Sequence, residues 1–254
     1  MQAHRVLAAL LLMATAWAGA PVHAQAQGQD LPAEEIIARV DANAQMGSVH
    51  ARSRMIIRAG RREIVKEMES WAEGRNALVT FLNPADRGTK FLKLGDDLWL
   101  YFPDAEDLVK ISGHMLRQGM MGSDFSYEDA LESEKLLERY QFSLVGSEEF
   151  DGVACYVVEA TVRPGEQVAY ARRRMWVDRE RFVVLREERY AASGRLLKVS
   201  HSEEVREVGG RFVATRITLE DKLRQDSSTT MMLESLEPDA PVPDGLFSLR
   251  SLTR

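Results

Sequence analysis

Runs in which apolar and polar residues alternate, each ended by a turn signal, constrain the fold of this chain more than any other feature. Val49 and Ala51 fall on one side of the first run, while His50 and Arg52 fall on the other. A period of two is typical of a β-strand with one buried face. Similar runs follow at 63–72, 77–82 and 89–94, with turn residues between them. The first half is therefore predicted to fold as an antiparallel meander.

The second half continues this pattern. Tyr140, Phe142 and Leu144 alternate with polar residues, and Asp151-Gly152 is a strong hairpin signal before the next run. Further turn signals recur about 15 residues apart, which favours long meander strands over the shorter strands of a sandwich. We expect a fold that is mainly β with a few helices (α+β), with about eleven strands in one strongly bent antiparallel sheet and helices on its concave side.

One amphipathic helix is expected before the first strand, from Leu31 to about Met46. Ile36, Ile37 and Val40 share one face of this segment, and charged residues occupy the rest. This spacing is typical of a surface helix that packs one apolar stripe against a core.

A strand near the middle of the chain is apolar on both sides. Leu98 and Leu100 alternate with Trp99 and Tyr101, so neither face of this strand can be left in water. A second apolar run at 108–111 follows across a proline-containing turn, which predicts a hairpin. Both faces of the hairpin are therefore expected to be covered by other parts of the chain.

The segment after this hairpin carries large apolar side chains among three glycines. The apolar side chains are Met115, Leu116, Met120 and Met121. Glycine weakens a helix, so the segment is expected to be mobile. Core packing is one interpretation of the methionines, and a flexible apolar lid over an adaptable ligand is the other. Ser126 followed by Asp129 resembles a capping box, which predicts a short helix from Tyr127.

Residues 1–24 have the pattern of a secretory signal peptide. His4 and Arg5 precede an apolar run, and Val22-His23-Ala24 is a small-residue cleavage site. The apolar run is shorter than the roughly 20 residues of a membrane-spanning helix. We therefore expect cleavage near Ala24, a soluble periplasmic product that is not an integral membrane protein, and a single domain over residues 25–254.

The sequence contains no constellation that is typical of catalysis or metal binding. His50, His114 and His201 lie far apart without metal-ligand spacing, and there is no nucleophile elbow or phosphate-binding loop. The single cysteine, Cys155, is predicted to be a small buried hydrophobic residue. We expect no catalytic residue, no metal and no cofactor. The net charge of −6 argues against nucleic acid and anionic membranes as partners.

A basic run, Arg172 to Arg174, lies within a predicted strand. Strand alternation sends Arg172 and Arg174 to one face and Arg173 to the other. A solvated face and a contact with a partner are both compatible with this arrangement.

Several motifs of the chain resemble a known family. They are Phe81-Leu82-Asn83-Pro84, Gly88, Trp99-Leu100-Tyr101-Phe102-Pro103, Gly122-Ser123-Asp124-Phe125-Ser126-Tyr127-Glu128-Asp129 and Trp176-Val177-Asp178. Together they resemble the long branch of the LolA-like family of outer membrane lipoprotein-sorting proteins. The resemblance implies an incomplete β-barrel, or half-barrel, in which helices cover a hydrophobic cavity. It implies no catalytic residue.

The resemblance also implies a function. In periplasmic members of the family the cavity shelters the acyl chains of a lipoprotein or lipid, which predicts a carrier or chaperone in lipoprotein transport to the outer membrane. The alternative is a protein-interaction or sensor module of the envelope. An inner-membrane transporter of the RND type is a further expected partner. The candidate ligand-binding residues are Leu98, Trp99, Leu100, Tyr101, Met115, Leu116, Met120, Met121, Phe125 and Tyr127.

Overall fold

The computed structural model describes residues 31–132 and 136–253. The predicted signal peptide and its cleavage site near Ala24 lie outside the described residues. Among the residues that are described, no helix is long and apolar enough to cross a membrane.

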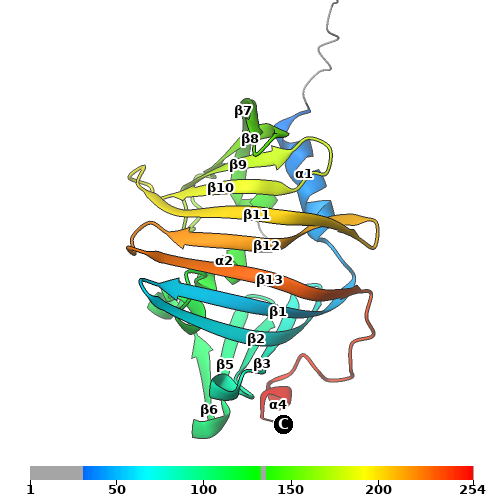
Figure 1. The fold of residues 1–254 in the computed structure, drawn as a ribbon, viewed down its shortest axis with the longest axis vertical. Coiled ribbons are helices and arrows are strands. Elements are labelled where there is room, and N and C mark those ends of the chain that lie inside the picture. Colours follow the sequence, from blue (N-terminus) through cyan, green and yellow to red (C-terminus); the bar gives the residue numbers. More distant parts are fainter. Residues whose placement is uncertain (1–30, 133–135, 254) are drawn as a thin grey trace, which may run out of the picture. The chain divides into compact units, whose positions relative to one another are not determined.

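The secondary structure is dominated by strands (Figure 1). The first six are β1 Ser48–Ala59, β2 Arg62–Glu73, β3 Asn76–Phe81, β4 Lys90–Leu94, β5 Asp97–Phe102 and β6 Asp107–Ile111. The others are β7 Tyr140–Phe150, β8 Val153–Val162, β9 Arg172–Asp178, β10 Val184–Tyr190, β11 Leu196–Val208, β12 Arg211–Asp221 and β13 Ser227–Pro238. The α-helices are α1 Ala33–Ala44, α2 Tyr127–Glu132, α3 Leu136–Arg139 and α4 Leu249–Leu252, and the 3-10 turns are η1 Pro84–Asp86, η2 Pro103–Ala105, η3 Gly113–Arg117 and η4 Met120–Gly122.

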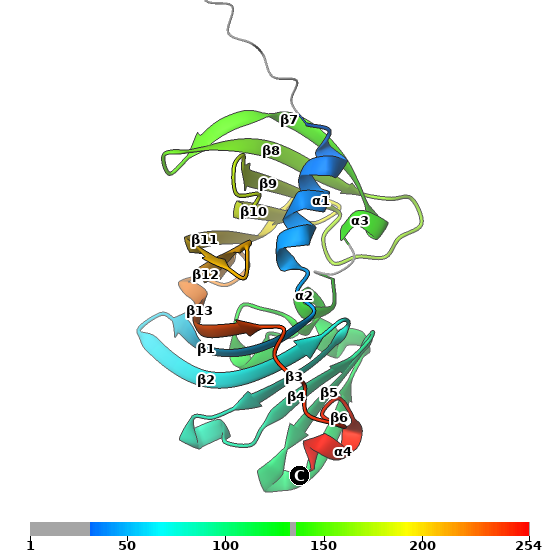
Figure 2. The ribbon, with the colours of Figure 1, turned by 90° about the vertical axis from the view of Figure 1, so that its right-hand side faces the viewer.

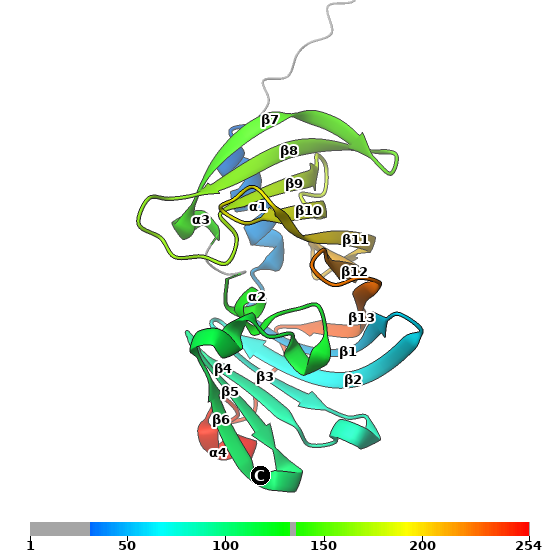
Figure 3. The same cartoon turned by 90° about the vertical axis from the view of Figure 1, so that its left-hand side faces the viewer.

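All thirteen strands form one antiparallel sheet, in the order β6-β5-β4-β3-β2-β1-β13-β12-β11-β10-β9-β8-β7. Two meanders meet where β1 pairs with β13, and β6 and β7 are the two edges. The sheet curves strongly, and α1, α2 and α3 lie on its concave side (Figure 2). Because β6 and β7 follow each other in the sequence but occupy opposite edges, the chain between them must cross the concave side (Figure 3).

This architecture confirms the predicted fold class of a mainly β chain with an open, strongly bent antiparallel sheet. The sheet has thirteen strands, whereas about eleven were expected from turn spacing. The predicted central hairpin is present, since β5 and β6 pair in antiparallel register from Leu98 with Ile111 to Phe102 with Asp107. The predicted first helix is α1, with Ile36 and Ile37 fully buried.

The concave side holds two separate cores. Under α1, the buried residues Ile36 and Ile37 pack with apolar residues of β7, β8 and β9. Under the chain that crosses from β6 to β7, a second core contains Leu98, Leu100 and Tyr127. The second core extends to Met231 of β13.

The short C-terminal helix α4 covers part of the other face. Leu252 of α4 is fully buried against Leu78 and Leu92, and Trp99 and Tyr101 pack beside them. The expectation that both faces of the β5 strand are covered is therefore confirmed, since Leu98 and Leu100 face the concave core.

Candidate ligand-binding site

The chain from Ser112 to Glu132, here called the cover segment, has a defined internal structure. Gly119 and Ser126 form an isolated antiparallel bridge, and the Met120 amide donates a hydrogen bond of 2.7 Å to the carbonyl oxygen of Phe125. Gly119 is required by this turn, because a Cβ atom there would lie 2.0 Å from the carbonyl oxygen of Ser123. The tip of the cover segment is thus a tight loop that closes on itself.

The apolar side chains of the cover segment pack on the sheet below. Met115, Leu116, Met120 and Met121 are partly buried against the core that includes Phe91, Leu98, Leu100 and Tyr127. The rings of Phe91 and Tyr127 are 5.6 Å apart between centroids. Phe125 is half-buried within the segment. In this arrangement the methionines fill space over β4 and β5.

The ten residues predicted to bind a ligand therefore fall into two groups. Eight of them belong to the cover segment or to the concave face beneath it. Trp99 and Tyr101 point to the opposite face and pack near Leu252 of α4. Strand alternation makes this separation unavoidable, because neighbouring residues of β5 project to opposite sides of the sheet.

Asp124 fixes the tip of the cover segment to β13. Its side chain is fully buried, and it accepts hydrogen bonds from the hydroxyls of Thr229 at 2.7 Å and Ser227 at 2.6 Å. The Asp124 amide donates a further hydrogen bond of 2.9 Å to the Thr229 hydroxyl. Arg224 lies 3.2 Å from the Asp124 carboxylate and supplies a positive charge. A buried carboxylate is tolerated when it is hydrogen-bonded and paired in this way.

Asp129 fixes the start of α2 to β10 and β11. Its carboxylate lies 2.5 Å from Lys198 Nζ and 2.9 Å from Arg189 Nη1, and it accepts a hydrogen bond of 2.7 Å from the Tyr170 hydroxyl. Burial alone would raise the pKa of Asp129, but Arg189 and Lys198 outweigh burial and hold this pKa below its ordinary range. Burial and the negative Asp129 raise the pKa of the Tyr170 hydroxyl, which therefore remains a donor.

The predicted capping box is confirmed at the same residue. The Ser126 amide donates to Asp129 Oδ2 at 2.8 Å, and the Asp129 amide donates to the Ser126 hydroxyl at 3.2 Å. One carboxylate thus caps α2 and also joins it to the sheet. The sequence pattern revealed the first role only, because Lys198 and Arg189 lie far away in the sequence.

The charge network continues along β9 and β10. Glu187 is buried and lies 2.5 Å from Arg173 Nε and 2.8 Å from Arg189 Nη2. Burial alone would raise the pKa of Glu187, but the two arginines lower it below its ordinary value. Arg172 and Arg174, by contrast, pair with Glu159 and Glu148 on the other face. The predicted split of the basic run is confirmed, and Arg173 is a buried member of the network.

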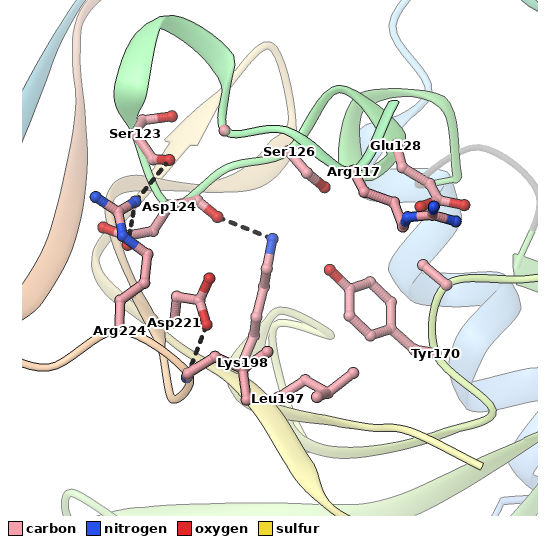
Figure 4. Close-up of a pocket in the computed structure, with 13 residues that line it drawn as sticks. Arg117, Ser123, Asp124, Ser126, Glu128, Tyr170, Leu197, Lys198, Asp221 and Arg224 are labelled. Atoms are coloured by element: carbon pink, nitrogen blue, oxygen red, sulfur yellow. Dashed lines mark hydrogen bonds and ion pairs between the residues drawn. The ribbon is translucent and has the colours of Figure 1, made fainter. Parts of the chain in front are cut away.

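A polar pocket of about 310 Å³ opens beside these anchors, between the cover segment and the ends of β11 and β12 (Figure 4). Its charged and hydroxyl-bearing walls include Arg117, Glu128, Tyr170, Lys198, Asp221 and Arg224. Lys198 projects into its centre and donates a hydrogen bond of 2.8 Å to the carbonyl oxygen of Asp124.

A second cavity, of about 390 Å³, lies between α1 and the middle of the sheet. Its apolar walls include Val40, Ala44, Phe182, Ile217, Leu233 and Leu236. Asn43 and Ser202 are its only polar lining residues within the described chain. The Asn43 amide is already used, since it donates to the carbonyl oxygens of Arg181 and Phe182 and accepts from the Phe212 amide. The cavity is therefore a largely apolar space in which the one amide side chain of the described wall is already hydrogen-bonded.

Other residues singled out in the sequence lie elsewhere. His50 is hydrogen-bonded to Glu69 at 2.9 Å, and the His201 ring stacks on Phe150. Cys155 is fully buried, and burial together with the nearby Asp178 raises its thiol pKa to about 11. The described residues hold no group of three or more His, Cys, Asp or Glu side chains arranged for a metal ion.

Comparison with known proteins gives a family. Residues 73–254 match the model of a protein family described as "uncharacterized protein". The chain belongs to this family, and its fold is LolA-like. No protein of curated function matches the sequence. The resemblance of the motifs around Trp99 and Asp124 to the LolA-like family is thus confirmed.

Solved structures show the same fold over most of the chain. A DUF1329 family protein from Desulfovibrio piger is 26% identical, with a TM-score of 0.80, over 87% of this chain and 97% of its own. An outer membrane lipoprotein-sorting protein domain from Vibrio parahaemolyticus is 24% identical, with a TM-score of 0.78, over 87% and 98%. A LolA superfamily protein from Nitrosomonas europaea is 24% identical, with a TM-score of 0.72, over 87% and 100%.

Proposed function

We propose that the chain is a periplasmic carrier that holds the apolar part of a lipid or lipidated protein in the cavity between α1 and the middle of the sheet. The observation that carries this proposal is the apolar lining of that cavity, in which the amide of Asn43 is already hydrogen-bonded. A volume of about 390 Å³ lies within the roughly 300–1,000 Å³ that is typical of small-molecule sites.

The LolA-like fold supports this proposal, because one of the similar structures is described as an outer membrane lipoprotein-sorting protein domain. Export with cleavage near Ala24, and a single carrier domain over residues 25–254, are part of the proposal. Association with an inner-membrane transporter is a further part. Intact mass of the purified protein tests the first point, since a retained signal or an added lipid anchor would contradict it.

The cover segment has a separate place in the proposal. Its methionines and the residues beneath it are packed against one another, so they would contact cargo only after the segment moves. Asp124 and Asp129 hold the end of the segment to the sheet, which leaves the part from Gly113 to Met121 as the part that is easier to displace. Cargo therefore enters the apolar cavity beside α1 first, and contact with Met120 and Met121 is secondary.

A bulky residue in the cavity tests the carrier function. Ala42 and Ala44 are both exposed residues of α1, but only Ala44 lines the cavity. Ala44→Trp should weaken the binding of a fluorescent fatty-acyl probe more than tenfold, because displacing two methylenes costs about 1.6 kcal/mol at about 0.8 kcal/mol each. Ala42→Trp is the matched control and should bind normally. Equal affinities for the two variants, at equal thermal stability, would contradict the proposal.

Native mass spectrometry of protein purified from its own envelope provides an independent test. A lipid or acylated peptide bound at one copy per chain is the expected result. A stoichiometric protein partner with no lipid would instead support an interaction or sensor module.

A further inference from the structure

The wall of the apolar cavity holds one polar side chain that the protein itself leaves unpaired. Ser202 of β11 lines the cavity and is half-buried. Its hydroxyl forms no hydrogen bond with any residue in the part of the chain that the structure describes. Asn43, the other polar residue of the described wall, already donates to the carbonyl oxygens of Arg181 and Phe182. The Ser202 hydroxyl is therefore available to a ligand that fills the cavity.

Ser202 faces the cavity because of its place in the sheet. It pairs directly with Ile217 of β12, which also lines the cavity, and directly opposed residues of an antiparallel pair share one face of the sheet. Ser200, two residues earlier on β11, points to the same face but is only 8% exposed and does not line the cavity. Ser202 is thus the one residue of β11 in the described wall.

Threonine hydroxyls in this part of the sheet are paired within the protein. Thr215 of β12 donates a hydrogen bond of 2.8 Å to the carbonyl oxygen of Glu204. The hydroxyls of Thr218 and Thr230 lie 3.0 Å apart and bond to each other. Ser202 has no such partner among the described residues, so hydrogen bonding within the sheet does not explain a hydroxyl at this position.

The surroundings of Ser202 determine what kind of group it can bind. None of the described residues that line the cavity carries a charge. A carboxylate or phosphate beside Ser202 would therefore be buried without a counter-charge, which is unfavourable. A hydroxyl can donate one hydrogen bond and accept others, so a neutral carbonyl or hydroxyl oxygen is a suitable partner. The cavity wall at Ser202 therefore favours an uncharged oxygen within an otherwise apolar ligand.

Filling of the cavity makes this hydroxyl selective. Water can reach a half-buried hydroxyl while the cavity is empty, but cargo that fills the cavity displaces that water. A plain hydrocarbon chain would leave the Ser202 hydroxyl buried without a partner, whereas a chain with a suitably placed oxygen would restore the hydrogen bond. The difference between these two outcomes corresponds to a preference of about tenfold.

We infer that Ser202 is a specificity-determining residue, which selects acyl cargo that carries a neutral oxygen where the chain passes β11. This inference rests on the proposed carrier function and adds a class of cargo to it. The ester carbonyl of an acyl glycerolipid and a hydroxyl group on the acyl chain both supply such an oxygen, so the two sources must be separated by experiment.

Competition against the fluorescent fatty-acyl probe provides the test. Monopalmitoylglycerol is compared with hexadecylglycerol, its ether analogue without the carbonyl group, and palmitic acid is compared with a series of its monohydroxylated forms. We expect the ester, or the acid hydroxylated at one particular carbon, to bind about tenfold more tightly than its plain counterpart. Either preference supports the inference, and the pair that shows it identifies the source of the oxygen.

Variants connect the preference to Ser202. Ser202→Ala should remove the preference without lowering the melting temperature, because the hydroxyl has no partner within the described protein. Ser235→Ala on β13, an exposed serine outside the cavity wall, is the matched control and should keep the preference. No preference in the original protein, or an unchanged preference in Ser202→Ala, would overturn the inference.

The same titrations separate this inference from the carrier function. Ser202→Ala should bind palmitic acid at least as tightly as the original protein, because the variant has no hydroxyl to leave unpaired. If the original protein fails to bind the probe, the carrier function fails and the inference fails with it. If the original protein binds the probe but shows no preference in either pair, only the inference fails.

Discussion

Replacing Asp129 by asparagine should strongly destabilise the protein. The Asp129 carboxylate lies within 2.9 Å of both Lys198 and Arg189 and accepts the Tyr170 hydroxyl. Its side chain is 7% exposed, so water cannot replace these contacts. Asparagine keeps the shape but not the charge. Lys198 would then remain buried without a counter-charge, while Arg189 would keep Glu187.

The expected loss follows from the cost of an unpaired buried charge. Removing one partner of a buried ion pair costs about 3–5 kcal/mol. For Asp129→Asn we expect the free energy of unfolding to fall by about 3 kcal/mol, because asparagine retains an oxygen for Tyr170 and Arg189 retains Glu187 as a partner. For a domain of this size about 2–4 °C is lost per kcal/mol, so the melting temperature should fall by about 6–12 °C.

The effect should depend on pH in a defined direction. The pKa of Asp129 is lower in the folded protein than its unfolded value of about 3.9, so the charged form contributes stability above that value. This contribution is lost as the pH falls toward the folded pKa. The difference in melting temperature between the original protein and Asp129→Asn should therefore be constant from about pH 5 to 8 and shrink toward pH 3.

Thermal melts followed by circular dichroism measure both effects. Asp97→Asn is the matched control, because Asp97 forms a single exposed pair with Lys110 at 2.8 Å. Exposed pairs contribute about 0–1 kcal/mol, so this control should melt within about 2 °C of the original protein. If Asp129→Asn melts no earlier than Asp97→Asn at pH 7, Asp129 does not anchor the cover segment as described.

Three further changes have expected outcomes. Gly119→Ala should lower the free energy of unfolding, measured in urea, by about 1–3 kcal/mol, because the added Cβ would meet the Ser123 carbonyl oxygen. Gly146→Ala is the control and should lower it little, because nothing lies near a Cβ at that position. Equal losses of stability in the two variants would contradict the close approach at Gly119. The Cys155 thiol is buried and has a pKa of about 11. At pH 8 it should therefore react with a thiol reagent only as fast as the protein unfolds. Rapid labelling without denaturant would be inconsistent with its burial. Burial raises the pKa of Glu128, so ionisation of this side chain destabilises the folded protein as the pH rises. Glu128→Gln should therefore have a higher melting temperature than the original protein at pH 7 and the same melting temperature near pH 3. A difference in melting temperature that does not change with pH would refute this reasoning.

The sequence by itself determined the features that depend on neighbouring residues. Alternation predicted the strands of both meanders and the opposite directions of Arg172 and Arg173, because a strand has a side-chain period of two. The pair Ser126 and Asp129 predicted the start of α2, since a capping box forms within one helical turn. The motif around Asp124 indicated the family before any fold was known.

Only the tertiary structure decided which of these residues meet. Asp129 reaches Lys198, 69 residues away, and Asp124 reaches Thr229, 105 residues away. No local pattern encodes such pairs, because they depend on the order of strands and on the path of the cover segment across the concave face.

The same reason explains where the cavities lie. Alternation shows that Leu98 and Trp99 face opposite sides of β5, but it does not show which side becomes concave. That choice follows from the pairing of β1 with β13 and from the curvature of the assembled sheet. The apolar cavity between α1 and the middle of the sheet forms only after the N-terminal helix and the last strands are brought together, because its walls come from opposite ends of the described chain.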